Sequence, residues 1–394
     1  MKAWLEKDTR DTRGAAEQQS VGIDVIIPVH SMERPLRRAV ESATKGAPEH
    51  LRVIVVCHNL PKQAMIDASG VLPSDTVEFH EFHDGRKSPA GPRNFGFSVS
   101  RGEYVAFLDS DDFFDEGALR EWAEECARRG RPEVLVGQVH SQSRRYLITP
   151  CPRVGRFTRL SAQRDLLSDR TAPQGVLIRR AALEPLGADL FQVGAPLGED
   201  LSVGLFIWNC IGDVAYSRSR AGYRLSDEGG DRITSAFHPL DTRLQPVGEV
   251  LEREWLAGLS PENRGAVARK LIRFDLINAI RGAARADALH RTHIAGLQAL
   301  VLAVEQLRPG ALRLLPLWET RVLRYIKNGD YDQLRNALQP SSHPKRVIER
   351  LFPGHVLGVF SPEQNYIRAF RTVLVRITLR RGSITGKLAR ARDA

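Results

Sequence analysis

The chain has 394 residues, of which 42% are hydrophobic and 26% charged. At roughly 150 residues per domain, this balance is typical of a globular protein of two or three domains, and it excludes global disorder, a collagen-like repeat and a disulfide scaffold. The net charge of +10 favours anionic partners, among them phosphorylated metabolites, nucleic acid and acidic membrane surfaces.

The cysteine pattern and the polar amino-terminal sequence both favour a reducing compartment. Cys57, Cys126, Cys151 and Cys210 form no C-x-x-C pair and show no zinc-ligand spacing. Residues 1–20 read as a polar arm that lacks the apolar segment of a signal peptide. No apolar run reaches the roughly 18 residues of a membrane-spanning helix. We therefore expect a cytoplasmic protein, and peripheral contact with the inner membrane face stays open.

The first part of the chain alternates short apolar runs with segments of helical periodicity. Strands are predicted at 24–29, 51–57, 77–82 and 104–108, and helices at 33–45, 61–70, 89–100 and 113–130. Further along, we expect strands within 134–149 and 213–225, and helices at 161–169, 179–186 and 198–208. This alternation predicts a parallel sheet with helices on both faces, in which ligands bind at the carboxyl ends of the strands.

After about residue 241 the sequence becomes rich in Ala, Leu and Arg. Its periodicity predicts helices at 246–258, 261–288, 291–307, 311–328 and 330–338. We therefore expect an α/β domain over 21–240, and a mainly helical region with an Arg-rich tail over 241–394.

Three carboxylates follow the fourth predicted strand, in the segment F-L-D-S-D-D that contains Asp109, Asp111 and Asp112. Like charges at this spacing repel one another, and a hard divalent cation with oxygen ligands relieves the repulsion. Mg²⁺ or Mn²⁺ typically takes one or two carboxylates together with substrate phosphates. Taken alone, the segment is equally consistent with an acidic turn that precedes a helix.

The order of the surrounding motifs makes this pattern more specific. G-P-R-N-F-G at 91–96 and G-E-Y-V-A-F at 102–107 precede the acidic segment, and the pair Glu199-Asp200 opens a later helix. With the first strand ending in Pro, these motifs resemble the inverting family 2 glycosyltransferases over about residues 22–240. The resemblance implies an α/β GT-A fold with a mostly parallel sheet, a glycosyltransferase activity of the hexosyltransferase class (EC 2.4), a nucleotide-sugar donor and Mn²⁺ or Mg²⁺ as cofactor.

The resemblance also implies a role for each matching residue. Asp200 is expected to be the general base, with Glu199 as second candidate, although the pair could be only an acidic first helical turn. Asp111 is expected to coordinate the metal, and Asp112 to support the metal or the donor sugar. The other implied donor-binding residues are Pro28, Val29, Arg93, Asp109 on the ribose or uridine side, and Arg232 as a phosphate clamp in the loop 227–235.

These residue types suit transfer with inversion, which is an in-line displacement at the anomeric carbon. A carboxylate must take the proton of the acceptor hydroxyl on the face opposite the leaving group. The departing nucleoside diphosphate gains negative charge, which a metal ion and Arg or Lys side chains stabilise.

One position departs from the family pattern. Family members commonly carry an Asp after the second strand that contacts the nucleotide base, whereas this chain reads Val56-Cys57-His58-Asn59. His58 or Asn59 is expected to bond a base edge instead, although a surface-loop histidine is the plainer interpretation of His58. Uridine is therefore the default base only because it is frequent in the family.

The acceptor implied by the resemblance is a hydroxyl of a cell-surface glycan, a teichoic-acid-like polymer or a lipid-linked glycan. The Arg-rich tail would suit an anionic membrane, and a homo-oligomer stays open. The alternatives are an inactive GT-A scaffold, a basic nucleic-acid-binding protein and a nucleotidyltransferase. The scaffold does not explain why every candidate carboxylate is present, and nucleic-acid binding does not explain the acidic cluster.

Overall fold

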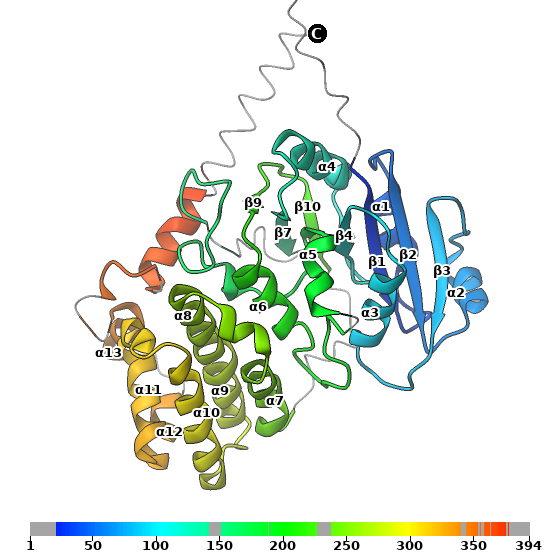
Figure 1. Cartoon of the computed structure of the whole chain (residues 1–394). Helices are drawn as coiled ribbons and strands as arrows, with labels where there is room; N and C mark the ends of the chain where they lie inside the picture. Colours follow the sequence, from blue (N-terminus) through cyan, green and yellow to red (C-terminus); the bar gives the residue numbers. More distant parts are fainter. Residues whose placement is uncertain are drawn as a thin grey trace, which may run out of the picture.

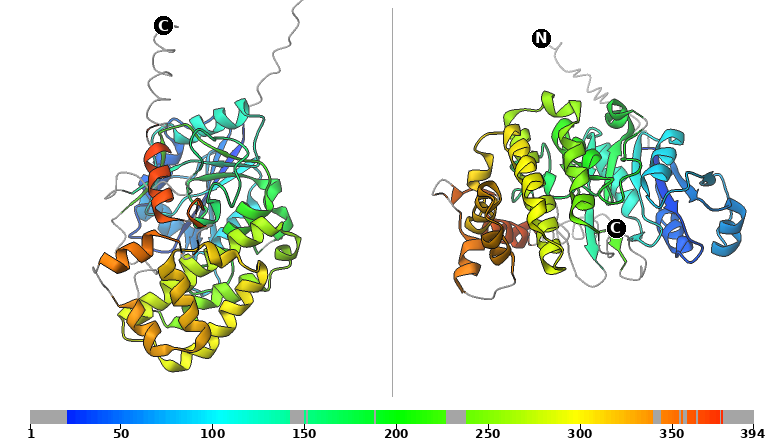
Figure 2. Two further views of the ribbon diagram at one scale, coloured as in Figure 1. Left: turned by 90° about the vertical axis from the view of Figure 1, so that its left-hand side faces the viewer. Right: turned by 90° about the horizontal axis from the view of Figure 1, so that it is seen from below.

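A computed structural model describes residues 21–141, 150, 152–187, 189–226, 238–339, 344–353, 355, 358–362, 364–375 and 377. An α/β part built on a twisted sheet lies beside a group of helices formed by the second half of the chain (Figures 1 and 2). The predicted arm 1–20, Cys151, Arg232 with its loop 227–235, and most of the tail lie outside the described residues.

A seven-stranded sheet with the order β3-β2-β1-β4-β8-β6-β9 forms the frame of the α/β part. Its strands are β1 (Ile23–Val29), β2 (Leu51–His58), β3 (Val77–Phe82), β4 (Tyr104–Phe107), β6 (Val134–Val136), β8 (Val176–Arg179) and β9 (Val214–Tyr216). Only β8 runs antiparallel to its neighbours, so the prediction of a mostly parallel sheet is confirmed. A smaller sheet joins β5 (Phe113–Phe114), β10 (Gly222–Leu225) and β7 (Gln138–Ser141).

Helices cover both faces of the large sheet, as predicted. Val25 and Ile27 pack in one apolar cluster with α1 (Leu36–Thr44), α2 (Lys62–Ser69) and α4 (Ala118–Arg128). Ile26, between them, packs in a second cluster with α3 (Ala90–Val99), α5 (Arg180–Leu183) and α6 (Leu201–Cys210). Because successive strand side chains point to opposite faces, a sheet covered on both sides needs the continuous apolar runs seen in the sequence.

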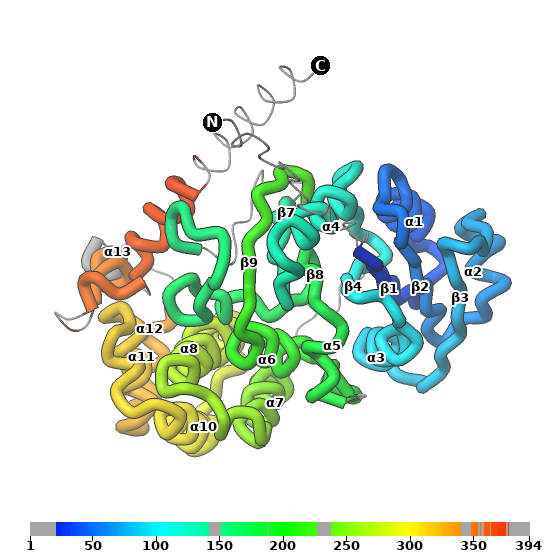
Figure 3. Tube along the Cα trace, turned by 45° about the horizontal axis from the view of Figure 1, so that its top comes forward, coloured from blue at the N-terminus to red at the C-terminus, as the bar shows by residue number. Residues whose placement is uncertain are grey.

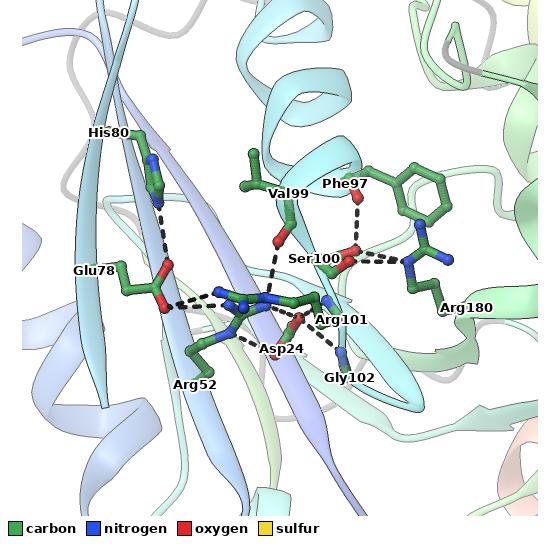
Figure 4. Close-up of polar contacts among 10 residues, drawn as sticks. All are labelled: Asp24, Arg52, Glu78, His80, Phe97, Val99, Ser100, Arg101, Gly102 and Arg180. Atoms are coloured by element: carbon green, nitrogen blue, oxygen red, sulfur yellow. Dashed lines mark hydrogen bonds and ion pairs between the residues drawn. The ribbon is translucent and has the colours of Figure 1, made fainter. Parts of the chain in front are cut away.

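A buried ionic network joins the amino ends of the first three strands (Figure 4). Asp24 is 3% exposed, and its Oδ2 accepts hydrogen bonds from Arg52 Nη2 at 2.6 Å and from the backbone N–H of Gly102 at 2.8 Å. Arg52 Nη1 also donates to Glu78 Oε1 at 3.1 Å. Burial raises the pKa of a carboxyl group, but these bonds outweigh it and hold the pKa of Asp24 below its usual value.

The second half of the chain is helical, as predicted. Its helices are α7 (Leu240–Leu251), α8 (Pro261–Lys270), α9 (Ile277–Arg285), α10 (Ile294–Leu307), α11 (Leu317–Asn328), α12 (Tyr331–Leu338) and α13 (Pro344–Leu351), and a π-helical turn (Leu271–Leu276) joins α8 to α9. Helices α7 to α12 share a core that also takes in Leu201 and Leu205 of α6. Among the described residues no helix combines the length and apolarity needed to cross a bilayer. The domain boundary near residue 240 stays a prediction.

Two predicted helices are wrong in detail. In 161–169 only Leu167–Asp169 form a helical turn, of 3₁₀ type. The buried carboxylate of Asp165 accepts hydrogen bonds from the backbone N–H of Ser161 and Arg153, and such side-chain bonds compete with helix formation. The helix predicted from residue 113 begins only at Ala118, after β5 and a Gly117 with φ of 75°. Of the strands expected within 134–149, β6 and β7 end by residue 141, and 142–149 lie outside the described residues.

Candidate active site

The strand order reverses direction between β1 and β4. Strands β2 and β3 extend the sheet on one side of β1, whereas the chain continues from β4 on the other side. In an α/β sheet, ligands bind at the carboxyl ends of the strands where the order reverses in this way. The acidic segment Asp109–Asp112 follows β4 at this position, as the sequence predicts.

Tyr223 of β10 holds the acidic segment in place through two hydrogen bonds of its hydroxyl group. Its hydroxyl donates to Asp112 Oδ2 at 2.7 Å and accepts the backbone N–H of Asp109 at 3.1 Å. Asp112 Oδ1 accepts the backbone N–H of Ser226 at 2.8 Å. Burial and the nearby charge of Asp109 raise the pKa of Asp112 to about 7. Asp112 is 4% exposed, so it is directed inward and anchors the segment.

Asp111, the predicted metal ligand, is paired with a cation of the protein. Its Oδ2 lies 2.5 Å from Arg34 Nη1, in the loop after β1, and its backbone carbonyl accepts a hydrogen bond from Arg38 Nη2 of α1 at 2.7 Å. No group of three or more His, Cys, Asp or Glu side chains that could hold a metal occurs within the described residues.

The motif G-P-R-N-F-G lies on α3, and its residues have separate structural tasks. A Cβ atom at Gly96 would lie 2.4 Å from Ile26 Cγ2, so glycine lets α3 approach β1 closely. The Asn94 side chain donates to the backbone oxygen of Phe191 at 2.8 Å and accepts its N–H at 2.9 Å. Arg93 reaches the acidic segment. The motif thus joins β1, β4 and the segment that leads to α6.

Arg93 is the bridge between the two acidic motifs. Its Nη2 donates to Asp109 Oδ1 at 2.7 Å and its Nη1 donates to Glu199 Oε1 at 2.9 Å. Burial opposes the charge of a guanidinium, but the two carboxylates outweigh it and raise the pKa of Arg93 above its ordinary value. Asp109 also accepts a hydrogen bond from Gln174 Nε2 at 2.8 Å. The structure therefore brings Arg93, Asp109 and Glu199 together.

Asp200 occupies the N-cap position of α6, yet its carboxylate does not cap the helix. Among the described residues, its side chain takes part in no hydrogen bond, whereas Glu199 beside it is engaged by Arg93. Burial and the charge of Glu199 raise the pKa of Asp200, against the opposing effects of Arg93 and Lys270. A carboxylate that is unbonded and has a raised pKa is suited to accept a proton.

The preceding Gly198 shapes the turn that presents this carboxylate. Its φ of +69° is in the left-handed region, which favours glycine, and a Cβ atom there would lie 3.1 Å from Pro246 Cγ of α7. The turn that carries Glu199 and Asp200 is therefore packed against the helical half of the chain.

The helical half also places charges near Asp200 that the sequence analysis missed. Asn263 at the start of α8 donates to the backbone oxygen of Asn209 at the end of α6, at 2.8 Å. Lys270, at the end of α8, is close enough to Asp200 to lower the pKa of its carboxyl group. Lys270 Nζ forms an ion pair with Asp275 of the π-helical turn at 2.8 Å. No motif links these positions, so only the fold reveals them.

The last residue of β2, His58, and the next residue, Asn59, form a cluster with the turn after β3. His58 Nε2 lies 2.7 Å from Asp84 Oδ1. Asn59, with φ of 57°, accepts the backbone N–H of Asp84 and Gly85 and donates to the backbone oxygen of Arg86. Asp84 thus brings a carboxylate next to His58 and Asn59.

Pro28 and Val29 end β1 in the buried interior. Val29 is fully buried and packs in the same apolar cluster as α1.

Comparisons with known proteins agree with this architecture. A structure of S. aureus TarS 1-349 in complex with UDP-GlcNAc matches 80% of this chain and 90% of that chain, with a TM-score of 0.65 and 18% sequence identity. An uncharacterized glycosyltransferase of Rickettsia bellii is 33% identical over 104 residues, which are 25% of this chain and 14% of that protein. A poly(ribitol-phosphate) beta-glucosyltransferase of Bacillus spizizenii is 22% identical over 120 residues, 30% of this chain and 19% of that protein.

The α/β part thus has a GT-A-like fold, the fold of nucleotide-sugar glycosyltransferases. Residues 24–187 match the model of glycosyl transferase family 2, and this part of the chain is a glycosyl transferase family 2 domain, as the motifs predicted. The chain spans only 14–39% of the length of the first three curated relatives that it matches.

Proposed function

We propose that this chain is a metal-dependent inverting glycosyltransferase that moves a sugar from a nucleoside diphosphate donor to an acceptor hydroxyl. The observation that carries the proposal is the Arg93 bridge, because it brings the acidic segment after β4 and the Glu199-Asp200 pair to one site. Donor chemistry and acceptor chemistry require such proximity, since inversion is an in-line displacement at one carbon atom.

In this mechanism Asp200 is the general base. It takes the proton of the acceptor hydroxyl as the acceptor oxygen forms its bond to the anomeric carbon. The bond from that carbon to the phosphate oxygen breaks, and the electron pair leaves with the nucleoside diphosphate. Glu199, held by Arg93, positions Asp200 and raises its pKa toward the operating pH.

Asp111 is the residue that would hold the divalent cation. A magnesium or manganese ion is commonly bound by one or two carboxylates together with substrate phosphates, and the single Asp111 carboxylate fits this pattern. Bound there, the ion would supply positive charge to the diphosphate. Arg34, which is paired with Asp111 in the free protein, would then be available to the same phosphates. Asp112 supports the segment through Tyr223.

We propose a uridine diphosphate sugar as donor. The structurally similar TarS was solved with UDP-GlcNAc, which supports this choice. Asp109 and Arg93 lie on the nucleotide side, and Arg232 remains our candidate for a phosphate clamp. In the cluster after β2, the carboxylate of Asp84, oriented by His58 and Asn59, is the group that replaces the family's base-contacting Asp.

For the acceptor we propose a hydroxyl of a cell-surface glycan, a polyol-phosphate polymer or a glycolipid. The similarity to a poly(ribitol-phosphate) beta-glucosyltransferase supports the polymer within this group. The net charge of +10 is favourable for an acceptor that carries many phosphates.

We further propose that the C-terminal helix contacts an anionic membrane at the cytoplasmic face. Residues 365–375 and 377 are helical, and Phe370, Val373 and Ile377 are 65%, 53% and 42% exposed. Their spacing places them on one side of the helix. Figure 3 shows this helix, in red, beside the segment 152–169, and Arg371 Nη1 donates to the backbone oxygen of Arg164 at 2.7 Å. The sequence 364–394 has eight basic residues and one acidic residue, which matches an anionic lipid surface.

Sedimentation with lipid vesicles tests this contact. We expect binding to vesicles that contain phosphatidylglycerol, weaker binding at high salt, and loss of binding in the double variant Phe370→Ser, Val373→Ser. Leu302→Ser, at an exposed site on α10, is the control. Absence of binding to anionic vesicles, or a concentration-dependent oligomer that the double variant disrupts instead, would contradict the membrane contact.

Thermal unfolding with nucleotides tests the transferase itself. A ligand that binds the native state raises the melting temperature. We expect UDP or a UDP-sugar with Mn²⁺ to raise it, and Asp111→Ala to abolish the metal-dependent part. Asp200→Asn should keep this shift while lowering kcat by about 10²–10⁴-fold. If no nucleotide shifts the folded protein, an inactive scaffold becomes the better explanation.

A further inference from the structure

Arg170 is a cation of the site that neither the motifs nor the mechanism above uses. It follows the 3₁₀ turn Leu167–Asp169, and its backbone oxygen accepts the indole N–H of Trp208 of α6. The next residue, Thr171, lies against the same helix, since a Cβ atom at Gly204 would be 2.2 Å from its backbone oxygen. The backbone at Arg170 is therefore fixed against the helix that Asp200 begins.

The guanidinium of Arg170 extends toward the strand beside the acidic segment. Its Nη1 lies 3.9 Å from the position of a Cβ atom at Gly175. Gly175 directly follows Gln174, whose amide donates to Asp109 Oδ2 at 2.8 Å. The same Cβ position lies 3.3 Å from Cβ of Tyr223, the residue that holds Asp112. The backbone of Arg170 thus lies against the middle and end of α6, and its guanidinium extends toward the residues that hold the acidic segment. Asp109 and Asp200 are both close enough to act on its charge.

Neither Asp109 nor Asp200 forms an ion pair with Arg170. Asp109 accepts from Arg93 and Gln174. Within the described residues, the guanidinium of Arg170 takes part in no hydrogen bond or ion pair, although the residue is only partly exposed. Burial lowers the pKa of Arg170, and the more distant charges of Asp109 and Asp200 offset this only in part. A partly buried charge without a direct partner is unfavourable in the free protein.

We propose that Arg170 binds a phosphate group of a substrate between Asp109 and Asp200. The planar guanidinium can donate two parallel hydrogen bonds to a phosphate, and the anion would supply the partner that the free protein lacks. The inference rests on the proposed function, since it assigns a ligand group to the same site. The phosphate belongs either to the donor diphosphate or to a phosphate-bearing acceptor.

The two sources give Arg170 different tasks. On the donor diphosphate, Arg170 would compensate the charge that develops on the leaving group. On an acceptor phosphate, it would hold the neighbouring hydroxyl close to Asp200. Both assign a binding contact to a residue that the family motifs do not contain.

Isothermal titration of Arg170→Gln distinguishes the two sources, with Arg170→Lys as the conservative variant. Arg156→Gln removes the same charge from an exposed loop position and is the matched control. If the donor is bound, Arg170→Gln weakens UDP binding at least tenfold, leaves uridine binding unchanged, and Arg170→Lys recovers part of the loss. If the acceptor is bound, UDP affinity is unchanged, but the KM for a polyol-phosphate acceptor rises at least tenfold while that for a phosphate-free acceptor does not.

Thermal unfolding of the ligand-free variants separates ligand binding from a structural role. Because Arg170 lacks a direct partner, Arg170→Gln should leave the melting temperature unchanged or raise it. A clear decrease would identify a structural residue and overturn the proposal. The proposal also fails if Arg170→Gln and Arg156→Gln both match the wild type in UDP affinity and acceptor KM.

Titration of pyrophosphate keeps this result distinct from failure of the proposed function. If the wild type binds neither UDP nor UDP-sugars, the glycosyltransferase proposal fails. Pyrophosphate binding that is at least tenfold weaker in Arg170→Gln would still establish the phosphate site. Pyrophosphate binding equal in both proteins would exclude a diphosphate as the ligand of Arg170 and, together with an unchanged KM for the polyol-phosphate acceptor, would overturn the proposal.

Discussion

Replacing Asp24 by Asn should destabilise the protein. Asp24 lies at the amino ends of the strands, and the candidate site lies at their carboxyl ends. The carboxylate accepts four hydrogen bonds, two from Arg52 and one from each backbone N–H of Arg101 and Gly102. Each bond to a charged group contributes about 1.5–3 kcal/mol, but such bonds do not add, and breaking a buried ion pair costs about 3–5 kcal/mol. We expect a loss within that range and a melting temperature lower by roughly 5 °C.

Guanidinium denaturation at neutral pH measures this loss, and Glu78→Gln is its control. Glu78 contacts the same Arg52 but is 30% exposed, so its replacement should change stability by less than about 1 kcal/mol. The pKa of Asp24 is lowered in the folded state, so its contribution is complete above the unfolded value of about 4 and is lost as the pH falls through the lower folded value. A loss below 1 kcal/mol for Asp24→Asn, or one that does not shrink in acid, would refute the reasoning.

Three further predictions concern the site. Lys270→Met should move the acidic limb of the kcat/KM profile to higher pH, because Lys270 lowers the pKa of Asp200; an unmoved limb would place Lys270 outside the site. Arg34→Gln should tighten Mn²⁺ binding to the free protein by about tenfold, measured by titration calorimetry, because it removes the cation paired with Asp111, and weaker binding would count against that competition. Tyr223→Phe should cost about 1–3 kcal/mol in chemical denaturation, and an unchanged midpoint would show that its hydroxyl does not hold the acidic segment.

The mostly parallel sheet and the positions of the motifs relative to its strands could be predicted from the sequence. Strand β1 shows why, since a run such as Ile23–Val29 with no polar alternation can be satisfied only in a sheet covered on both faces. The acidic segment and the Gly198-Glu199-Asp200 turn could be located because their spacing from predicted elements is short.

What the sequence could not supply are contacts between distant segments. Arg93 and Glu199 are 106 positions apart, and nothing local in either motif indicates that they meet. The same is true of Arg34 with Asp111, and of Arg170. The failed helix at 161–169 has a related cause, because its periodicity is sound but the buried Asp165 binds the backbone that a helix would need.

The packing of α6 makes the candidate base dependent on the far half of the chain. Its first turn shares an apolar core with α8 through Leu201 and Leu205, and Gly198 lies against Pro246 of α7. Exchanging the helical half for that of a relative, as acceptor-swapping chimaeras would attempt, therefore also exchanges the surface on which Asp200 is set. Such chimaeras should lose turnover before they lose donor affinity, unless α6 is transferred together with α7 and α8.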